Sequence, residues 1–271
     1  MRQNLHTHSK YCDGSNECEE MVLAAIEKRF DILGFSGHGP VKDPYAMSIE
    51  GTREYINEVL HLKEEYKDQI NIYLGVEEDS TNRMWVKEPF EFVIGSVHTL
   101  THDGITMAID YNRGILEMMH ESWYGNDFRK LAKDYYEDVA EMAKWDEVDI
   151  IGHIDLITKY NEDESFIRFD DPAYVRYASD AIDAFAGVKI MEVNTGAIAR
   201  GNRKTPYPYK NLLSYMHEKG VQIVLNSDCH DARYLDCAFE ETLEMIRRCG
   251  YTSMMKLTDH GFEETDLDEF E

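Results

Sequence analysis

The stretch Asn4-Leu5-His6-Thr7-His8, at the start of the chain, is the segment around which the predicted fold is organised. Its two histidines are two positions apart, so both imidazoles point to the same face of a β-strand. Neutral imidazole is a common ligand of zinc and related ions, so this pair can supply two ligands of a metal site. A His-X-His pair alone is more often incidental, and its meaning depends on what the other strands carry.

The chain has 271 residues, a hydrophobic fraction of 43% and a formal net charge of −25. The length and the apolar content suit one large domain with a sizeable core, and β/α barrels often have this size. The negative charge argues against nucleic-acid binding, because a polyanion would be repelled. A small anionic substrate stays compatible with it, because bound metal cations reverse the sign of the charge locally.

The five cysteines are odd in number and include no Cys-X-X-Cys pair, which predicts reduced thiols in a cytoplasmic protein. The first residues show no basic segment followed by a long apolar run, and no stretch approaches the roughly 20 apolar residues of a membrane span. We therefore expect neither secretion nor membrane association. The oligomeric state stays open at this point.

Short apolar runs alternate with longer amphipathic ones along the chain. Strands are predicted at residues 2–8, 31–36, 70–76, 90–97, 149–152, 188–193 and 221–226, with a short last strand at 253–257. Helices are predicted at residues 18–29, 52–67, 126–145, 172–186, 209–219 and 235–248. The alternation implies parallel pairing through right-handed crossovers, and it favours an α/β fold in the form of a closed or nearly closed β/α barrel.

Residues 1–260 are expected to form this single barrel domain, followed by an acidic tail at 261–271 that we expect to be frayed. The long insert between His98 and Asp149 contains the aromatic pairs Trp123-Tyr124 and Tyr135-Tyr136. These aromatics could belong to a lid or an interface, although packing in the core is the favoured interpretation.

Histidines or carboxylates follow nearly every predicted strand. They are His6 and His8 on the first strand and Asp13 after it, His38 after the second, Glu77 at the end of the third, His98 after the fourth, His153 after the fifth, and Asp228 and His230 after the seventh. In a β/α barrel the functional site lies at the carboxyl ends of the strands and is built from several of them. One zinc ion needs three or four protein ligands, so this set can serve two or three metals.

Taken together, these motifs resemble those of the polymerase-and-histidinol-phosphatase (PHP) superfamily. The motifs that carry the resemblance are His6-Thr7-His8, Ser36-Gly37-His38, Gly75-Val76-Glu77, Gly95-Ser96-Val97-His98, Gly152-His153-Ile154-Asp155 and Ser227-Asp228-Cys229-His230. They occur in the family's order from residue 4 to about residue 232. The resemblance implies a distorted, TIM-barrel-like (β/α)7 barrel with a centre of three metals.

The resemblance also implies how the ligands are shared among the metals. The first metal would be held by His6, His8, Glu77 and Asp228, the second by Glu77, His98 and His153, and the third by Asp13, His38 and His230. Glu77 would then connect two metals. Zinc is the expected metal, with manganese or iron as alternatives.

The stretch Glu192-Val193-Asn194-Thr195-Gly196, followed by Arg200 and by Tyr207-Pro208, resembles the histidinol-phosphatase branch of this superfamily. That branch typically has Asn-Thr-Ser-Gly before an arginine and Tyr-Pro, whereas here the serine is missing and the segment is longer. The resemblance implies substrate contacts by Arg200, Asn194 and Lys159. Asp110 would face an amine on the leaving group.

The expected activity is that of a metal-dependent phosphomonoesterase that hydrolyses L-histidinol phosphate, a small phosphorylated substrate. The attacking group would be a hydroxide that bridges two metals. Glu77, Asp228 and His230 are predicted to lie at the reaction centre, and the acid that protonates the leaving group is left unassigned.

Three alternatives remain. One is a phosphoesterase of the same superfamily that acts on a nucleotide or another small phosphomonoester. Another is a metal-dependent amidohydrolase, although that class usually has a bridging lysine where Glu77 stands. The third is a regulatory or scaffold protein with a relict centre, which an intact ligand set disfavours.

Overall fold

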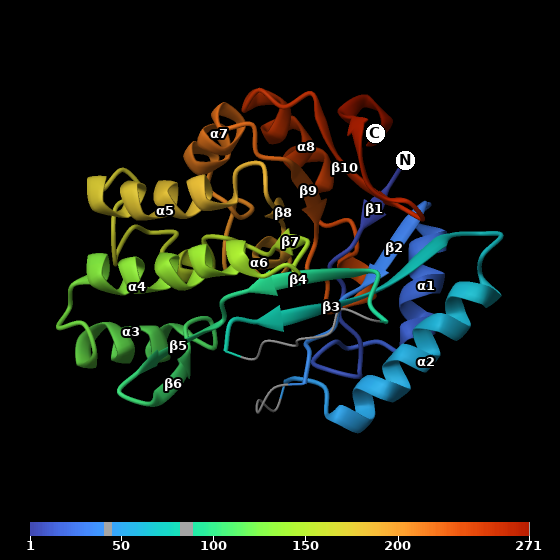
Figure 1. Ribbon diagram of the computed structural model, residues 1–271, viewed down its shortest axis with the longest axis horizontal. Coiled ribbons are helices and arrows are strands. Elements are labelled where there is room, and N and C mark those ends of the chain that lie inside the picture. Colours follow the sequence, from blue (N-terminus) through green and yellow to red (C-terminus); the bar gives the residue numbers. More distant parts are fainter. Residues whose placement is uncertain (41–44, 82–88, 271) are drawn as a thin grey trace.

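Seven parallel strands form the sheet at the centre of the computed structural model, which describes residues 1–40, 45–81 and 89–270. The strands lie in the order β1-β2-β3-β4-β7-β8-β9 (Figure 1). Their bounds are β1 Gln3–Asn4, β2 Ile32–Phe35, β3 Asn71–Asp79, β4 Phe92–Ser96, β7 Ile150–Ile151, β8 Ile190–Asn194 and β9 Ile223–Asn226. Each strand pairs with its neighbour in parallel, as the alternation of strands and helices predicted.

The helices lie outside this sheet, with α1 and α2 on one side and α4, α5 and α7 on the other (Figure 1). Their bounds are α1 Cys18–Glu27, α2 Ile49–Glu65, α3 Arg113–Ser122, α4 Phe128–Glu141, α5 Pro172–Phe185, α6 Gly196–Ala199, α7 Lys210–Glu218 and α8 Phe239–Arg248. In α5, Asp171 accepts hydrogen bonds from the first backbone N–H groups and Pro172 occupies the first turn. Both features favour a helix start, because the first N–H groups lack partners within the helix.

The start of the chain closes the sheet into a nearly closed barrel by pairing with its last strand. Beyond β1 and β9, Thr7 forms a parallel bridge with Cys229: the Cys229 N–H donates to the His6 carbonyl at 3.0 Å, and the His8 N–H donates to the Cys229 carbonyl at 2.8 Å. Nearer the strands, the Leu5 N–H donates to Oδ1 of Asn226 at 2.8 Å. A side-chain amide thus takes part in the contact between the two ends of the sheet. The predicted barrel is confirmed.

The part of the barrel interior nearer the amino ends of the strands is apolar and is called the apolar layer below. Its buried members are Leu5, Ile32, Tyr73, Phe92, Ile94, Ile150, Ile190, Val224, Met255 and Leu257. The Phe92 ring lies against two glycines, one on β3 and one on β2: a Cβ added at Gly75 would lie 2.3 Å from the ring, and one at Gly34 would lie 2.8 Å from it. These two positions therefore need glycine because the ring occupies the space of a side chain.

The C-terminal segment is ordered, so the expectation of a frayed tail at 261–271 is wrong for its described part; Glu271 lies outside the described residues. Strands β10 Ser253–Thr258 and β11 Gly261–Asp266 form an antiparallel hairpin, followed by the 3-10 helix η4 Leu267–Phe270. The side chain of Gln3 pairs with β10, donating to the Met255 carbonyl and accepting from the Leu257 N–H. The hairpin thus covers the amino end of the barrel with Met255 and Leu257.

The insert between β4 and β7 contains elements that the sequence did not predict. Strands β5 Thr99–His102 and β6 Ile105–Ala108 form a hairpin, and helix α3 follows it. Helix α4 occupies most of the helix predicted at 126–145. Tyr124, Tyr135 and Tyr136 are buried against the main core, in agreement with the favoured interpretation of the insert's aromatics.

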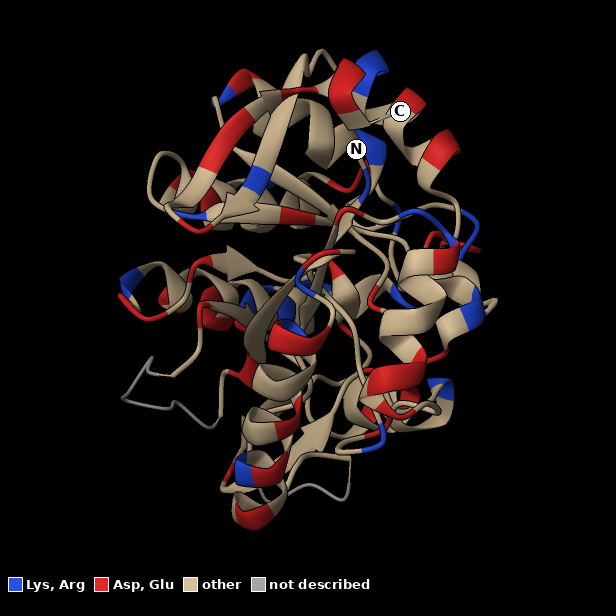
Figure 2. Ribbon diagram, turned by 90° about the vertical axis from the view of Figure 1, so that its right-hand side faces the viewer, with Lys and Arg blue, Asp and Glu red and all other residues tan. Residues whose placement is uncertain are grey.

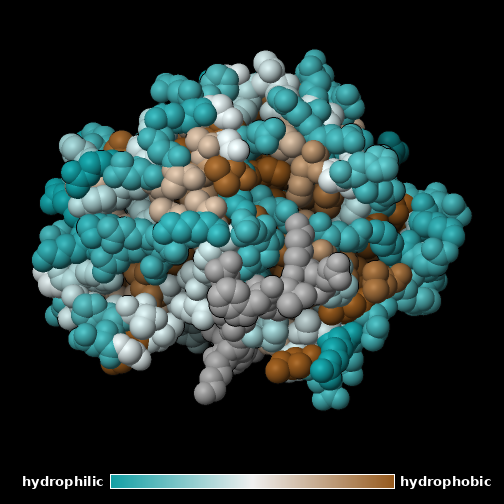
Figure 3. Space-filling model, in the orientation of Figure 1, coloured by the Kyte–Doolittle hydropathy of each residue, from teal (hydrophilic) through white to brown (hydrophobic). Residues whose placement is uncertain are grey.

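Charge and polarity are spread over the outer surface. Acidic residues outnumber basic ones on the helices and loops (Figure 2). The face drawn in Figure 3 is mostly hydrophilic, with apolar side chains in separate small areas. Among the described residues, no helix combines the length and the apolar character needed to cross a membrane.

Candidate metal centre

The nine predicted ligand residues gather at the carboxyl ends of the barrel strands. Their donor atoms form three overlapping groups, each with all its atoms within 4.8 Å of one another. The groups are His6, His8 and Asp228; His38, Glu77 and His98; and His8, Asp13, His38 and His230. His153 joins the second group, because its Nε2 lies 3.2 Å from Oε1 of Glu77. The structure therefore places all nine residues in one cluster.

Glu77 lies at the middle of this cluster and is 1% exposed. Its Oε2 lies 3.3 Å from Nε2 of His6, 3.5 Å from Nε2 of His8 and 3.1 Å from Nδ1 of His38. Its Oε1 lies 3.4 Å from Nε2 of His98 and accepts a hydrogen bond from Ser96 at 2.6 Å. One carboxylate thus faces imidazoles from several strands, as expected of a residue that connects two metals.

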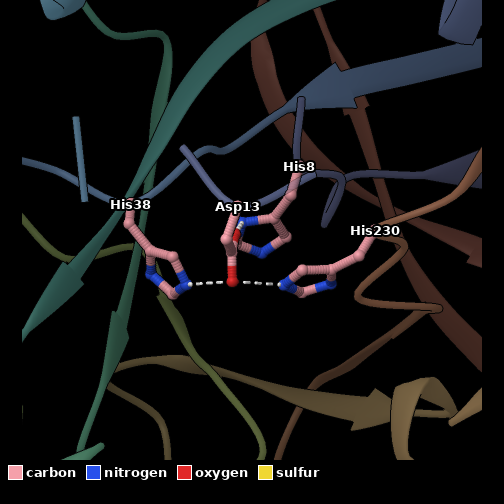
Figure 4. Close-up of side chains that lie close together, drawn as sticks. All are labelled: His8, Asp13, His38 and His230. Carbon is pink, nitrogen blue, oxygen red and sulfur yellow. Dashed lines mark hydrogen bonds and ion pairs between the residues drawn. The ribbon is translucent and has the colours of Figure 1, made fainter. Parts of the chain in front are cut away.

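The third group lies nearer to solvent than the other two. The side chains of Asp13, His38 and His230 are 20–24% exposed, whereas those of His6 and His8 are fully buried. Oδ2 of Asp13 lies between His230, at 3.1 Å, and His38, at 3.7 Å (Figure 4). His8 contributes to two groups, with Nε2 toward Asp228 at 3.3 Å and Nδ1 toward Asp13 at 3.4 Å. The sequence motifs assign His8 to the first metal only. In the structure its Nδ1 also faces Asp13, which the motifs assign to the third metal.

Several buried atoms at the middle of the cluster have no hydrogen-bond partner among the described residues. They are Nε2 of His6, Nε2 of His8, Oδ1 of Asp13 and Oε2 of Glu77. Buried polar atoms in proteins are normally hydrogen-bonded, because leaving them without a partner costs free energy. Imidazole nitrogens and carboxylate oxygens that face one another in this way fit divalent zinc, manganese or iron. The donor set and its unpaired atoms therefore fit a metal centre.

The backbone at Asp228 is unusual and helps to aim its carboxylate. Asp228 has a φ of 47°, in the left-handed region that residues other than glycine seldom adopt. Such conformations concentrate at functional sites. Here the turn after β9 brings Oδ1 of Asp228 within 3.6 Å of Nε2 of His6.

The alternation of acids and imidazoles shifts the pKa of both. Burial opposes a charge on His6, but the carboxylates of Glu192, Glu77 and Asp228 outweigh it and raise the pKa of His6 to about 10. Burial likewise opposes charge on Glu77 and Asp228, yet the surrounding cations hold the pKa of each carboxyl well below its usual range. The carboxylates thus attract positive charge to this point, and protons compete with metal cations for the same atoms.

Arg200 reaches the cluster from the end of α6, where the sequence placed a phosphate contact. Its Nη2 lies 2.8 Å from Oδ2 of Asp228 and its Nη1 lies 3.1 Å from Nδ1 of His230. Its side chain is 31% exposed. A Cβ added at Gly196 would lie 2.8 Å from Oδ2 of Asp228 and 2.9 Å from Nη2 of Arg200, so only glycine fits beneath this pair.

A cavity of about 750 Å³ opens beside the cluster. Asp13, His38 and His98 line it from the cluster, and Asp110 and Lys159 line it from the side. Nζ of Lys159 donates to Oδ2 of Asp110 at 3.1 Å and to its carbonyl at 2.9 Å. The two residues that the sequence assigned to separate substrate contacts are therefore an ion pair on one wall of the cavity.

Asn194 does not fit its predicted substrate contact. Its side chain is fully buried, its Nδ2 donates to Glu192 at 2.8 Å, and its Oδ1 accepts from the Gly196 N–H at 2.8 Å. Because both amide atoms are bound within the protein, Asn194 supports the loop before Arg200 and does not face the cavity.

Two carboxylates outside the predicted set contact its histidines. Oε1 of Glu192 lies 2.7 Å from Nδ1 of His6, and Oδ2 of Asp79 lies 3.2 Å from Nδ1 of His98. Burial raises the pKa of Asp79, but hydrogen bonding and charge from His98 lower it to about 2. Asp79 is the last residue of β3, whereas Glu192 is the middle residue of β8. Their contacts with the histidines depend on the direction of each side chain, which the spacing along the chain does not give.

The fold and the cluster together define a β/α-barrel protein with a candidate centre for several metals. Family comparison agrees with this: the model of the PHP domain matches residues 4–196. The chain belongs to the PHP domain family.

Relatives and a solved structure extend the similarity over most of the chain. "Probable histidinol-phosphatase" of Schizosaccharomyces pombe is 28% identical over 275 residues, covering 92% of this chain and 87% of the relative. The protein of the same name from Deinococcus radiodurans is 28% identical over 261 residues, covering 90% of this chain and 92% of the relative. Histidinol phosphate phosphatase of Lactococcus lactis, solved with zinc, L-histidinol and phosphate, has a TM-score of 0.74 and 20% identity, covering 97% of this chain and 98% of that chain.

Proposed function

We propose that the chain is a metal-dependent phosphomonoesterase that hydrolyses L-histidinol phosphate to L-histidinol and phosphate. The observation that carries this proposal is Glu77, a buried carboxylate that faces imidazoles from several strands and leaves Oε2 without a hydrogen bond. The names of the relatives and the ligands of the Lactococcus lactis structure support the choice of substrate.

The centre would hold two or three divalent ions, with zinc the first choice. The residues proposed to hold them are His6, His8, Asp13, His38, Glu77, His98, His153, Asp228 and His230. When bound, such ions make water a stronger nucleophile at neutral pH and neutralise charge on phosphoryl oxygens. Oε2 of Glu77 faces His6 and His38, and its Oε1 faces His98 and His153. Glu77 would therefore contribute to two of the metal positions.

Arg200 is proposed to bind the phosphoryl group. Asp228 fixes the guanidinium at 2.8 Å, and the exposed part of the side chain leaves N–H donors for an anion. A fixed cation of this kind stabilises the charge that develops on phosphoryl oxygens during transfer. We therefore propose that Arg200 acts in both binding and turnover.

The leaving group would lie in the cavity beside the centre. Asp110 brings a carboxylate to the wall of this cavity, held in place by Lys159. Burial raises the pKa of Asp110, but the Lys159 cation outweighs it, so the pKa of the carboxyl is lowered and it stays ionised. A fixed carboxylate suits the ammonium group of histidinol, whereas it would repel a second phosphate.

We propose a cytoplasmic location, because all five cysteines are free thiols and a reducing compartment keeps them so.

The test is phosphate release from L-histidinol phosphate, compared with a panel of nucleotides and sugar phosphates, on protein whose metal content has been measured. We expect two to three metal ions per chain, a preference for L-histidinol phosphate, and loss of turnover on chelation that zinc restores. Arg200→Met should lower kcat/KM by roughly 10²–10³-fold, the effect of losing one principal electrostatic contact. Arg168→Met, at an exposed arginine paired with Asp170, is the matched control and should leave kcat/KM unchanged.

Protein that binds no metal after careful preparation would overturn the metal centre. Protein that binds metal but hydrolyses a nucleotide faster than L-histidinol phosphate would overturn the substrate and leave the centre in place.

A further inference from the structure

Glu192 is a fully buried carboxylate directly beneath the candidate metal centre. It lies on β8, where Ile190, Glu192 and Asn194 share one face of the strand. Ile190 belongs to the apolar layer of the barrel interior. Glu192 itself is in none of the three donor groups found among the described residues. It is therefore a buried charge that needs an explanation other than direct metal binding.

Each oxygen of Glu192 accepts two hydrogen bonds. Oε1 lies 2.7 Å from Nδ1 of His6 and 2.9 Å from Nδ2 of Asn226. Oε2 lies 2.9 Å from the backbone N of His153 and 2.8 Å from Nδ2 of Asn194. These partners come from four different strand regions, so Glu192 connects the start, the middle and the end of the barrel.

The orientation of the two asparagine amides is fixed independently of Glu192. Oδ1 of Asn226 accepts from the Leu5 N–H at 2.8 Å, and Oδ1 of Asn194 accepts from the Gly196 N–H at 2.8 Å. The Nδ2 group of each side chain must then face Glu192 as a donor. With the His153 N–H, three of the four partners can only donate, and a proton on Glu192 would have no acceptor among them.

The consequence falls on His6. A carboxylate can only accept, so Nδ1 of His6 carries the hydrogen of the 2.7 Å contact. In a neutral imidazole the other nitrogen, Nε2, then holds the lone pair. Nε2 lies 3.3 Å from Glu77 and 3.6 Å from Asp228, and it is buried with no hydrogen-bond partner in the described part of the chain. The ring thus presents its ligating nitrogen to the centre.

We propose that Glu192 is a positioning residue that fixes Nδ1–H of His6 and so turns Nε2 of His6 toward the metal centre. This inference rests on the metal-dependent function proposed above. Carboxylates behind a ligating histidine set the orientation of its ring, and their loss typically costs about 10–100-fold in metal affinity or activity. A role limited to holding the barrel together would instead change stability and leave the chemistry of His6 unchanged.

The experiment measures His6 and zinc directly. In zinc-loaded protein with ¹⁵N-labelled histidine, NMR reports which ring nitrogen of His6 carries the proton, with the signal assigned by means of His6→Asn. We expect the proton on Nδ1 in the unsubstituted protein. Glu192→Gln should lose this signal pattern and bind zinc about 10–100-fold more weakly in competition with a chromophoric chelator. Excess zinc should restore much of its turnover, because the ligands themselves remain.

Glu91→Gln is the matched control. Glu91 lies just before β4, at the other end of the barrel, accepts the Leu74 N–H at 2.9 Å, and is only 33% exposed. The same chemical change there should leave the His6 signal and the zinc affinity unchanged. Glu192→Asp keeps the charge but withdraws it by one methylene, and it should weaken zinc binding less than Glu192→Gln does.

A proton on Nε2 of His6 in the unsubstituted protein would overturn the proposal, even if Glu192→Gln failed to fold. Folded Glu192→Gln with unchanged zinc affinity would also overturn it. The NMR and zinc-affinity measurements use no substrate, so a wrong substrate and a wrong role for Glu192 give different results.

Discussion

The barrel interior has an apolar layer and a polar layer, and the two lie only a few residues apart on the same strands. On β4, Phe92 and Ile94 belong to the apolar layer, whereas Ser96 donates to Glu77 in the polar one. On β3 the corresponding pair is Tyr73 and Glu77. The polar layer has buried atoms without hydrogen-bond partners among the described residues. The apolar layer is closely packed and covered by the hairpin of β10 and β11.

All these side chains point into the barrel, so their direction does not distinguish the two layers. What distinguishes them is whether the residue lies near the amino end or near the carboxyl end of its strand. All these residues follow the period of two that marks one face of a strand. Near the amino ends, the inward side chains stabilise the fold by burial. Near the carboxyl ends, the same face gathers charges whose burial only a cation compensates. Changes in the two layers should therefore have opposite signatures.

The largest effect is expected from Glu77→Gln in the polar layer. The substitution removes the charge that faces His6, His38 and their neighbours, so turnover should fall by roughly 10³-fold or more, as when a principal electrostatic group is lost. Metal content should fall with it, because the amide lacks the charge that holds cations. Phosphate release and elemental analysis on the same sample check this.

The control for Glu77→Gln is His61→Ala. His61 lies on α2 with its side chain 75% exposed, so neither turnover nor metal content should change. Turnover of Glu77→Gln within tenfold of the unsubstituted protein would contradict the central position of this carboxylate.

The next largest effect is expected from Phe92→Ala in the apolar layer. Removing this buried ring should lower the free energy of unfolding by about 3–5 kcal/mol, because the cavity left behind loses packing contacts. While the protein is folded, its metal content should match that of the unsubstituted chain. Urea unfolding of metal-free protein and elemental analysis of loaded protein separate the two results.

Gly75→Ala sharpens this test, because the added Cβ would lie 2.3 Å from the Phe92 ring. It should be strongly destabilising alone and tolerated better in combination with Phe92→Ala. Equal effects of Gly75→Ala in both backgrounds would contradict its contact with the Phe92 ring, and loss of metal from folded Phe92→Ala would show that the two layers are not separate.

The smallest effect is expected from Asp138→Asn on α4, where acids crowd together on the surface. Asp138 is exposed, but the surrounding protein partly desolvates its carboxyl; this desolvation and then the charge of Asp134 raise the pKa of Asp138 to about 6, above the ordinary 3.8. Between these values the folded state binds a proton that the unfolded state has lost, so the free energy of unfolding falls as the pH rises. Asp138→Asn should therefore match the unsubstituted protein near pH 4. At pH 7 it should be more stable, by less than about 1 kcal/mol because the side chain is exposed.

Urea unfolding of metal-free protein at several pH values measures this difference. Asp170→Asn is the control of opposite sign, because its hydrogen bond to Arg168 lowers the pKa of Asp170. That substitution should be destabilising at neutral pH, and its effect should shrink as the pH falls below the ordinary 3.8 and through the lowered pKa of Asp170. A stability difference for Asp138→Asn that does not change with pH would contradict the raised pKa.

Much of the fold follows from local pattern, because seven strands separated by amphipathic helices leave few arrangements other than a parallel barrel. The elements that were missed lack that pattern. In β11 the residues Glu263 and Glu264 are exposed and Phe262 is only partly buried, so the strand resembles a polar tail until β10 pairs with it. Its order comes from a partner and from the barrel end beneath it, which composition does not report.

The candidate site was predictable as a set of residues but less so as a set of contacts. Strand ends located all nine cluster members, and the loop after β8 brought Arg200 to the cluster. The substrate contact of Asn194 stays a prediction, and in the structure its amide donates to Glu192 and accepts from the Gly196 N–H. Lys159 and Asp110 were each predicted at the site, but their pairing depends on a distance that spacing along the chain does not determine.

The bridge between Thr7 and Cys229 has a consequence for the time at which the centre can exist. A chain grows from its N-terminus at about 5–20 residues per second, so the first histidines wait roughly 10–40 seconds for β9 to be synthesised. Until then the barrel is open and the group of His6, His8 and Asp228 is incomplete. Metal loading at this group is therefore a late event in the life of a new chain, after its two ends have met.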